Sequence, residues 1–464
     1  MFRKLLKKTS IAFLFLLILF GCARFFDVSL GGIYDAARAP YLQVPTTDSI
    51  IIRWNTKKAN IGVVRVGQSI NKMDKIFYEK SADDEHKLEL TGLSPNTKYY
   101  YRVGTGKYSL YEGKEYWFKT LPDKLKEPIR FWVTGDQGQA GVIQNNVRDA
   151  MLDWAKKNPI KLSNDIKSNL DFWLTTGDNA YRSGTNQQFQ DNFFIPYGSI
   201  LKHTPVWPIY GNHDARRRAF FKLFSFPEKA ESGGVASHTP KYYSFNYASL
   251  HVVVLDTQSS RIQQNSRMLR WLEKDLAANK QKWLIAVFHH PPYTAGSHHS
   301  DNLADSFNRM QNVRRYMLPI LENGGVDVVL SGHSHMYERS WFMNCHYGFS
   351  NQFSSKNVKD KQTKNDWVST KVKQKGLIYN KAQSEEIKNT GTVYITLGSS
   401  ARLDRGDLNH PAMPVSLHKS GSMIFDIKGD VLTANFITSA GIVDDSFSIV
   451  KDDKKSLVEM ELCE

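Results

Sequence analysis

Five short motifs carry side chains that can bind metal ions, and each directly follows an apolar run typical of a strand. The motifs are Gly135-Asp136-Gln137-Gly138, Gly177-Asp178-Asn179-Ala180-Tyr181, Gly211-Asn212-His213-Asp214, His289-His290-Pro291-Pro292 and Gly332-His333-Ser334-His335. Carboxylates and neutral imidazoles are ligands that suit iron, zinc or manganese. A single Gly-Asp after a strand is usually only a turn. Five such strand exits in one chain indicate a shared metal site instead.

The second motif is the expected centre of that site. Its carboxylate, Asp178, stands at the exit of a buried strand, where it can bridge two cations. Three residues later comes Tyr181, and a tyrosinate is a ligand that only a strongly Lewis-acidic metal holds. We therefore expect the other motifs to gather around Asp178.

The region that must position these motifs begins near residue 129. From there, apolar runs typical of strands alternate with segments of helical period, which is an α/β pattern. In such folds, ligands bind beyond the carboxyl ends of the strands. Helices are expected over residues 142–156, 266–278 and 306–322. The apolar residues on one face of the last helix are Phe307, Met310, Val313, Met317, Ile320 and Leu321.

The preceding residues, 40–121, have a different pattern of short strands rich in β-branched and aromatic residues. The stretch Leu93-Ser94-Pro95-Asn96-Thr97-Lys98-Tyr99 resembles the tyrosine corner of fibronectin type III-like sandwiches. We expect an all-β sandwich with a structural role here, and a linker over residues 122–128. The catalytic domain then covers residues 129–450. Its polar insertion at about 345–390 is expected to be a partly disordered loop or a lid.

The length of 464 residues favours two domains, and the formal net charge is +15. Many lysines lie in the leader and in residues 356–388, and no helix alternates basic with aromatic residues. This distribution favours solvated loops over a nucleic-acid-binding groove. The basic charge would still help to attract anionic substrates.

Residues 1–22 have the composition of an export signal. A basic start is followed by an apolar run over residues 11–20, which is too short for a comfortable membrane span. The run ends in Gly21-Cys22, which resembles a bacterial lipoprotein processing site. Lipidation of Cys22 would anchor the chain to a membrane, in the periplasm or at the cell surface. The alternative is an ordinary signal peptide that leaves a secreted protein.

Two cysteines remain beyond the leader, Cys345 and Cys463. In an exported chain they can pair with each other. That bond would hold the C-terminus against the polar insertion. Two free thiols are the alternative, and both readings stay open.

Taken together, the five motifs resemble those of calcineurin-like metallophosphoesterases, and Tyr181 narrows the resemblance to the purple acid phosphatase type. Members of that group often carry a fibronectin-like N-terminal domain. The resemblance implies a catalytic domain with two β-sheets packed as a sandwich and flanked by helices. The segment Gly441-Ile442-Val443-Asp444-Asp445-Ser446-Phe447 also resembles the family's last strand region.

The resemblance implies two metal ions that share Asp178. The ligands of the first ion would be Asp136, Asp178, Tyr181 and His335. The ligands of the second would be Asp178, Asn212, His289 and His333. Fe(III) is expected in the Tyr181 site, and Fe(II), Zn(II) or Mn(II) in the other.

Two local points follow for the histidines. Neighbouring side chains of an extended segment point in opposite directions, so only one of His289 and His290 should face the metals. The family's pattern of histidine, any residue and proline selects His289. In the last motif, His333 and His335 can reach different metals only if the backbone kinks, and we expect the kink at Gly332.

The resemblance also implies the residues that handle substrate. His213 resembles the family's substrate-facing histidine, and His298 is the candidate for the second catalytic histidine, with His299 as its rival. Both His213 and His298 would bind substrate and serve catalysis. Arg216 could bind phosphate, and a solvated charge on a helix is the equal alternative.

The expected function is an exported, acid phosphatase-type hydrolase that cleaves small phosphate monoesters by attack of a metal-bound hydroxide. The first alternative is a phosphodiesterase or nucleotide pyrophosphatase, which the same ligands would serve. The remote alternative is an inactive surface binding protein. It predicts missing ligands, and none of the expected ligands is missing.

Overall fold

The computed structural model describes residues 36–451, apart from residue 107, residues 162–165, 168–169 and 217, and residues 361–374 and 382–389. The expected signal, Cys22 and Cys463 lie outside the described residues. The chain divides into two compact units. The first contains residues up to Leu121 together with Gly198–Pro205, and the second contains Pro122–Tyr197 and the residues from Val206 onward.

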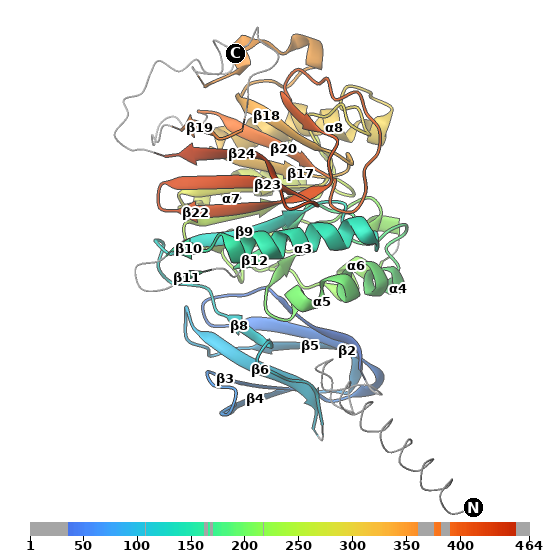
Figure 1. The fold of residues 1–464 in the computed structure, drawn as a ribbon, viewed down its shortest axis with the longest axis vertical. Coiled ribbons are helices and arrows are strands. Elements are labelled where there is room, and N and C mark those ends of the chain that lie inside the picture. The colour runs from blue at the N-terminus through green and yellow to red at the C-terminus, as the bar shows by residue number, and fades with distance from the viewer. Residues whose placement is uncertain are drawn as a thin grey trace, which may run out of the picture. The chain divides into compact units, whose positions relative to one another are not determined.

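Residues 36–121 of the first unit form strands that pair antiparallel in two sheets (Figure 1). One sheet has the order β1 (Ala36–Gln43), β2 (Ile50–Asn60) and β5 (Asp83–Leu90). The other has the order β4 (Lys75–Tyr78), β3 (Gly62–Gly67), β6 (Lys98–Thr105) and β7 (Ser109–Tyr111), with β8 (Trp117–Lys119) also paired to β6.

Alternation along the strands builds the core of this unit. In β5, His86, Leu88 and Leu90 are buried, while the charged residues between them face outward. The expected tyrosine corner is present, because the Ser94 N–H donates to Tyr99 Oη at 2.9 Å. That bond ties the loop before β6 to the start of the strand, as the sequence predicted.

The second unit contains two seven-stranded sheets. The first has the order β13 (Val206–Trp207), β12 (Phe172–Thr175), β9 (Ile129–Thr134), β22 (Gly421–Lys428), β23 (Val431–Thr438), β24 (Val443–Val450) and β19 (Leu377–Asn380). The second has the order β14 (Tyr243–Tyr247), β15 (Leu250–Val254), β16 (Trp283–Val287), β17 (Val328–Ser331), β20 (Thr392–Leu397), β18 (Tyr337–Met343) and β21 (Val415–Leu417).

The two sheets pack against each other through aromatic rings. Trp207 of β13 stacks on Phe245 of β14 at 3.9 Å, and Tyr337 of β18 stacks on Phe436 of β23 at the same distance. Helix α3 (Val142–Lys157) contacts β22 and β23 on the outside of the first sheet. Helix α7 (Arg267–Ala278) contributes to the core on the second sheet. The expected sandwich flanked by helices is confirmed.

Strands β9, β12 and β13 run parallel to one another, as do β15, β16, β17 and β20. All residues of β9, β12, β16 and β17 are buried, which is typical of parallel strands covered on both faces. Parallel strands place their carboxyl ends at the same edge. The first and second motifs follow β9 and β12 of one sheet, and the fourth and fifth follow β16 and β17 of the other, so the edge of each sheet gathers two motifs.

The helix predicted over residues 306–322 begins later than expected. Ser306, Phe307 and Asn308 all have left-handed backbone angles, and α8 (Arg309–Asn312) starts only after them. A π-helical turn over Val313–Met317 and α9 (Leu318–Asn323) follow. Met310, Val313, Met317 and Leu321 are buried as predicted. The prediction for Phe307 was wrong, because its side chain is 84% exposed.

The described parts of the polar insertion contain regular structure. Two short 3-10 turns cover Ser350–Gln352 and Ser355–Asn357, and β19 adds an edge strand parallel to β24. Cys345 is disulfide-bonded, so it is not a free thiol. Its partner lies outside the described residues, and the pairing with Cys463 stays a prediction. Among the described residues, no helix combines the length and apolar character that a membrane span requires.

Candidate metal centre

The strand exits are bent sharply at three of the predicted ligands. Asp136 after β9, Asp178 after β12 and His333 after β17 have φ angles of 55°, 53° and 68°. Left-handed angles are uncommon for residues other than glycine and cost on the order of 1–3 kcal/mol each. Each left-handed residue changes the direction of the backbone immediately after its strand, and with it the direction of the side chain. The kink expected at Gly332 is therefore found one residue later, at His333.

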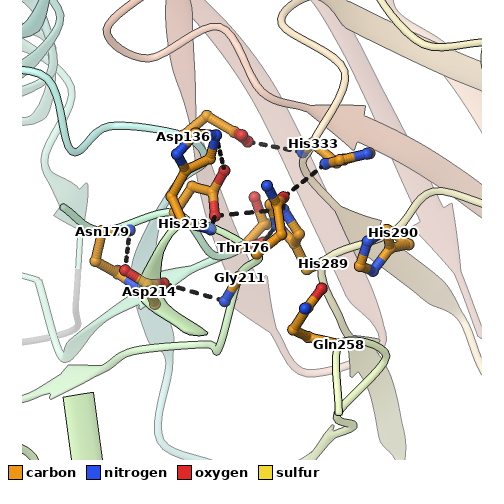
Figure 2. Close-up of polar contacts among 12 residues, drawn as sticks. Asp136, Thr176, Asn179, Gly211, His213, Asp214, Gln258, His289, His290 and His333 are labelled. Atoms are coloured by element: carbon orange, nitrogen blue, oxygen red, sulfur yellow. Dashed lines mark hydrogen bonds and ion pairs between the residues drawn. The ribbon is translucent and has the colours of Figure 1, made fainter. Parts of the chain in front are cut away.

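Small residues allow the motifs to approach one another closely. A Cβ on Gly211 would lie 2.2 Å from Asp178 Oδ1 and 2.3 Å from the Asp178 nitrogen. A Cβ on Gly332 would lie 2.5 Å from Asp136 Oδ2. Glycine is therefore required at both positions for the backbone to pass beside the carboxylates. Figure 2 shows Asp136 and His213 on one side, and His289 and His333 on the other side, of the same space.

One half of the candidate centre surrounds the phenol of Tyr181. Its Oη lies 3.1 Å from each of three acceptor atoms. These atoms are Asp136 Oδ1, Asp178 Oδ2 and His335 Nε2. The other ring nitrogen of His335, Nδ1, lies 2.7 Å from Asp404 Oδ2 and must donate to it. When the ring is neutral, which is the form that binds a cation, Nε2 is an acceptor and the single phenol hydrogen faces three acceptors.

The other half surrounds the amide oxygen of Asn212. His289 Nε2 lies 2.8 Å and His333 Nδ1 2.9 Å from Asn212 Oδ1. His289 Nδ1 lies 2.8 Å from the Thr176 carbonyl, which can only accept, so this nitrogen carries the proton. The neutral His289 ring therefore turns a lone pair toward the amide oxygen.

The same argument applies to His333. Its Nε2 lies 2.7 Å from Ser306 Oγ, whose hydroxyl donates to Asp305 Oδ1 at 2.8 Å. The proton of the ring is therefore on Nε2, and Nδ1 presents a lone pair to Asn212 Oδ1. Three lone pairs converge here without a hydrogen between them. Such a donor set fits a cation, and it is composed of the residues predicted for the second ion.

Asp178 faces both halves. Its Oδ2 lies 3.1 Å from Tyr181 Oη, and its Oδ1 lies 3.5 Å from His289 Nε2. The His213 N–H also donates to Oδ1 at 2.8 Å, which fixes the carboxylate plane. Asp136, Asp178 and His289 present ligand atoms within 4.8 Å of one another. The structure thus brings together all seven predicted metal ligands.

The electrostatics of the first half favour positive charge. Burial raises the pKa of the Tyr181 phenol well above its usual value, and the carboxylates of Asp136 and Asp178 raise it further. Burial opposes protonation of His335, but hydrogen bonds and charge from Asp136 and Asp404 outweigh burial and raise its pKa to about 9. In contrast, burial and neighbouring imidazoles hold the pKa of His333 well below its usual value.

A buried carboxylate, Asp214, ties the second and third motifs together. It accepts from the backbone N–H groups of Asn179 at 2.9 Å and Gly211 at 3.0 Å, and from the Asn179 side chain at 2.8 Å. Burial raises its pKa well above the usual value, and the charge of Asp178 adds to that effect. Asp214 therefore holds the loops that carry Asp178 and Asn212.

His213 and His298 both lie beside the candidate ligands. His213 Nδ1 donates to the Arg182 carbonyl at 2.7 Å, and Nε2 lies 3.8 Å from Asp178 Oδ2. The ring of His298 stacks on His333 at 3.8 Å. His299 is exposed, and its Nδ1 accepts from the Asp301 N–H at 3.2 Å. The structure thus places His298, not His299, against the candidate centre.

The His290 ring packs against the His333 ring, with 4.6 Å between the ring centroids, but its Nδ1 is engaged elsewhere. Its Nδ1 lies 2.9 Å from Thr257 Oγ1, and the residue is buried. Figure 2 shows it beyond His289 as seen from Asp136. Arg216 is exposed on the short turn Asp214–Arg216, and its role in phosphate binding stays a prediction.

The residues missed by sequence reasoning are those that hold the imidazoles: Asp404, Asp305, Ser306 and Thr176. Thr176 immediately precedes the second motif, but the group that contacts His289 is its backbone carbonyl, and no side-chain pattern predicts such a contact. Asp404 lies in a loop, and Asp305 and Ser306 lie in the short 3-10 segment Asp305–Asn308; no motif marks any of the three. Asp404 is held in turn by the Arg402 Nε atom at 2.9 Å.

Comparisons with known proteins agree with this geometry. The family profile for calcineurin-like phosphoesterases matches residues 129–337, and the profile for the purple acid phosphatase N-terminal domain matches residues 38–120. Purple acid phosphatase 21 of Arabidopsis thaliana is 28% identical over 317 residues, which are 64% of this chain and 65% of that protein. Purple acid phosphatase of Glycine max is 26% identical over 57% of this chain and 54% of its own length.

Solved structures show the same fold. A purple acid phosphatase from yellow lupin seeds has a TM-score of 0.67 at 17% identity, with 92% of this chain and 78% of that chain covered. The structure titled PhoD has a TM-score of 0.56 at 14% identity, with 87% of each chain covered. The chain spans about half to two thirds of the length of the curated relatives it matches. The chain thus contains a calcineurin-like phosphoesterase domain over residues 129–337, preceded by a purple acid phosphatase N-terminal domain over residues 38–120.

Proposed function

We propose that this protein hydrolyses small phosphate monoesters with two metal ions. Fe(III) would lie between Asp136, Asp178, Tyr181 and His335. Fe(II), Zn(II) or Mn(II) would lie between Asp178, Asn212, His289 and His333. The observation that carries the proposal is the convergence of seven ligand-type side chains from five strand exits, with Asn212 Oδ1 facing His289 Nε2 and His333 Nδ1 in the second half.

Two ions in such a site polarise a phosphoryl oxygen and lower the pKa of a water molecule. The remaining steps belong to side chains of this protein. The Nδ1 atoms of His213 and His298 are held by the Arg182 carbonyl and by Asp305 Oδ1, at 2.7 and 2.8 Å. In each ring, Nε2 is left to meet the substrate. A protonated ring can donate from Nε2 to a phosphoryl or leaving-group oxygen.

The test is elemental analysis combined with a substrate panel. The expected result is two ions per chain, a visible absorption band from tyrosinate bound to iron, and faster hydrolysis of p-nitrophenyl phosphate than of bis(p-nitrophenyl) phosphate. A protein that binds no ion, or that cleaves neither ester, would refute the proposal. A colourless, fully metallated and active protein would refute only the iron–tyrosinate part.

We also propose that the protein is exported and anchored to a membrane by a lipid on Cys22. The support is the sequence of residues 1–22, with its basic start, short apolar run and Gly21-Cys22 end. The variant Cys22→Ser should move the protein from the membrane fraction to the soluble fraction. Equal membrane association of the variant would contradict lipidation.

A further inference from the structure

The last motif carries two imidazoles that are two residues apart in the sequence. Each imidazole makes a hydrogen bond to a different segment of the chain. His335 is held by Asp404, at 2.7 Å. His333 is held by Ser306, at 2.7 Å, and Ser306 is held by Asp305, at 2.8 Å. The two supports come from separate loops, so they can be altered one at a time.

The backbone around Ser306 is shaped in an unusual way. Ser306, Phe307 and Asn308 have φ angles of 52°, 55° and 63° in succession, although none is glycine. Arg309 Nη1 donates to the Ser306 carbonyl at 3.0 Å, which holds the bend from its far side. Three successive left-handed residues persist only where the surrounding structure holds them. The bend puts the Ser306 hydroxyl on His333 and leaves Phe307 84% exposed.

Asp305 connects this bend to a second histidine. Its Oδ1 accepts from Ser306 Oγ and also from His298 Nδ1, both at 2.8 Å. Its Oδ2 accepts from the His299 N–H at 3.0 Å. Because the carboxylate takes the hydroxyl hydrogen, Ser306 Oγ can only accept from His333. The pair thereby fixes which nitrogen of His333 carries the proton, and His298 stacks on that ring at 3.8 Å.

We propose that Asp305 and Ser306 are positioning residues for the second metal ion. They hold His333 with its proton on Nε2, so that the lone pair of Nδ1 faces Asn212 Oδ1 and the ion. Hydrogen-bond partners of metal-binding histidines fix the tautomer and ring orientation, and their loss lowers metal affinity about 10–100-fold. The inference rests on the proposed function, because it requires an ion in this half of the centre.

The test compares Ser306→Ala with the neighbouring variant Phe307→Ala. Both change one left-handed residue of the same bend, but only the first removes the contact with His333. The measurement is the retention of Zn(II) by the purified, Zn(II)-loaded protein as a competing chelator is increased. Ser306→Ala should lose the second ion at a chelator concentration about 10–100-fold lower than wild type, with the first ion retained. Phe307→Ala should match wild type.

A further variant separates metal binding from folding. Glycine accepts the left-handed angle without strain, so Ser306→Gly should keep or raise the melting temperature while still losing the second ion early. Wild-type retention of both ions in Ser306→Ala and Ser306→Gly would overturn the inference and leave the proposed function intact. A wild-type protein that binds no ion would overturn both.

Discussion

The two halves of the candidate centre differ in charge, although they share Asp178. The half around Tyr181 offers two carboxylates, a phenol and one imidazole. The half around Asn212 offers a neutral amide oxygen, two imidazoles and the shared carboxylate. Anionic oxygens favour a small ion of high charge, whereas imidazoles suit divalent iron, zinc or manganese. The comparison teaches that, if two ions bind as proposed, ligand charge alone would distinguish the two positions, although both draw on the edges of the same two sheets.

The supports of the imidazoles follow the same division. His335 is backed by a carboxylate, Asp404, which adds negative charge to its half. His289 is backed by the Thr176 carbonyl, and His333 by the Ser306 hydroxyl. A carboxylate makes an imidazole a more basic ligand than a neutral acceptor does. The two halves therefore differ in charge not only in their ligands but also in the groups that hydrogen-bond to their imidazoles.

The largest expected effect comes from Asp178→Asn, which alters the residue that both halves share. Loss of the shared charge should weaken both ions together. We expect kcat/KM for p-nitrophenyl phosphate to fall at least about a thousandfold, or about 4 kcal/mol in activation free energy. Ion content should fall below two per chain. Near-normal turnover would show that the carboxylate does not join the two halves.

Tyr181→Phe should affect only the anionic half. The phenylalanine ring keeps the packing against His213, whose centroid lies 4.3 Å away, but removes the oxygen ligand. We expect the visible band to disappear and kcat/KM to fall about tenfold, roughly 1.4 kcal/mol, with Zn(II) retention in the other half unchanged. Absorption spectra and elemental analysis would check this. A band that survives the substitution cannot come from this tyrosinate.

Asp404→Asn alters the group that supports His335, as Ser306→Ala alters the group that supports His333. It removes charge behind His335 but leaves a hydrogen-bond acceptor. The ion of the Tyr181 half should then be lost at a chelator concentration about 10–100-fold lower, while the second ion is retained. If Asp404→Asn and Ser306→Ala release the same ion first, the two halves do not have separate supports.

The smallest expected effect is a difference in proton release. In the ion-free protein at pH 7.5, His335 is protonated because its pKa is raised to about 9, and the Tyr181 phenol also keeps its proton. An ion entering this half must displace both protons, whereas His333 in the other half is already neutral. Above pH 9, His335 loses its proton beforehand, so release should fall from about two protons to about one.

Calorimetric titration in buffers of different ionisation enthalpy would measure this release. The matched measurement is Zn(II) binding to the half around Asn212, where the proton of the His333 ring stays on Nε2. Equal, pH-independent release from both halves would contradict the assigned charges. Asp404→Asn should lower the release from the first half below pH 9, because it removes one of the two carboxylates that raise the pKa of His335.

Much of the centre could be predicted from sequence because its ligands directly follow strands. Local apolar patterns locate the strands, and parallel order then brings Asp136 and Asp178 to the edge of one sheet, and His289 and His333 to the edge of the other. Asp404 and Ser306 could not be predicted in the same way. Their contacts depend on how distant loops close, 69 and 27 residues from their partners. The residue pattern around Asp404 and Ser306 does not predict these long-range contacts.

The error at Phe307 has a related cause. Helical period depends on the spacing of apolar residues, and Phe307 has the right spacing before Met310 and Val313. A left-handed bend formed by serine, phenylalanine and asparagine does not alter the spacing of apolar residues, so the sequence pattern cannot reveal it. The tyrosine corner was predicted correctly because one side chain, Tyr99, makes it within a few residues of sequence.

The close approach at Gly211 has a consequence for how the protein tolerates change. The atoms that an added methyl group would meet are Oδ1 and the backbone nitrogen of Asp178. Neither can move aside without displacing the group that joins the two halves. In a saturation scan of single substitutions, Gly211 should therefore be as intolerant as the charged residues around it. The absence of a methyl group at Gly211 is therefore as necessary for the centre as any of its side chains.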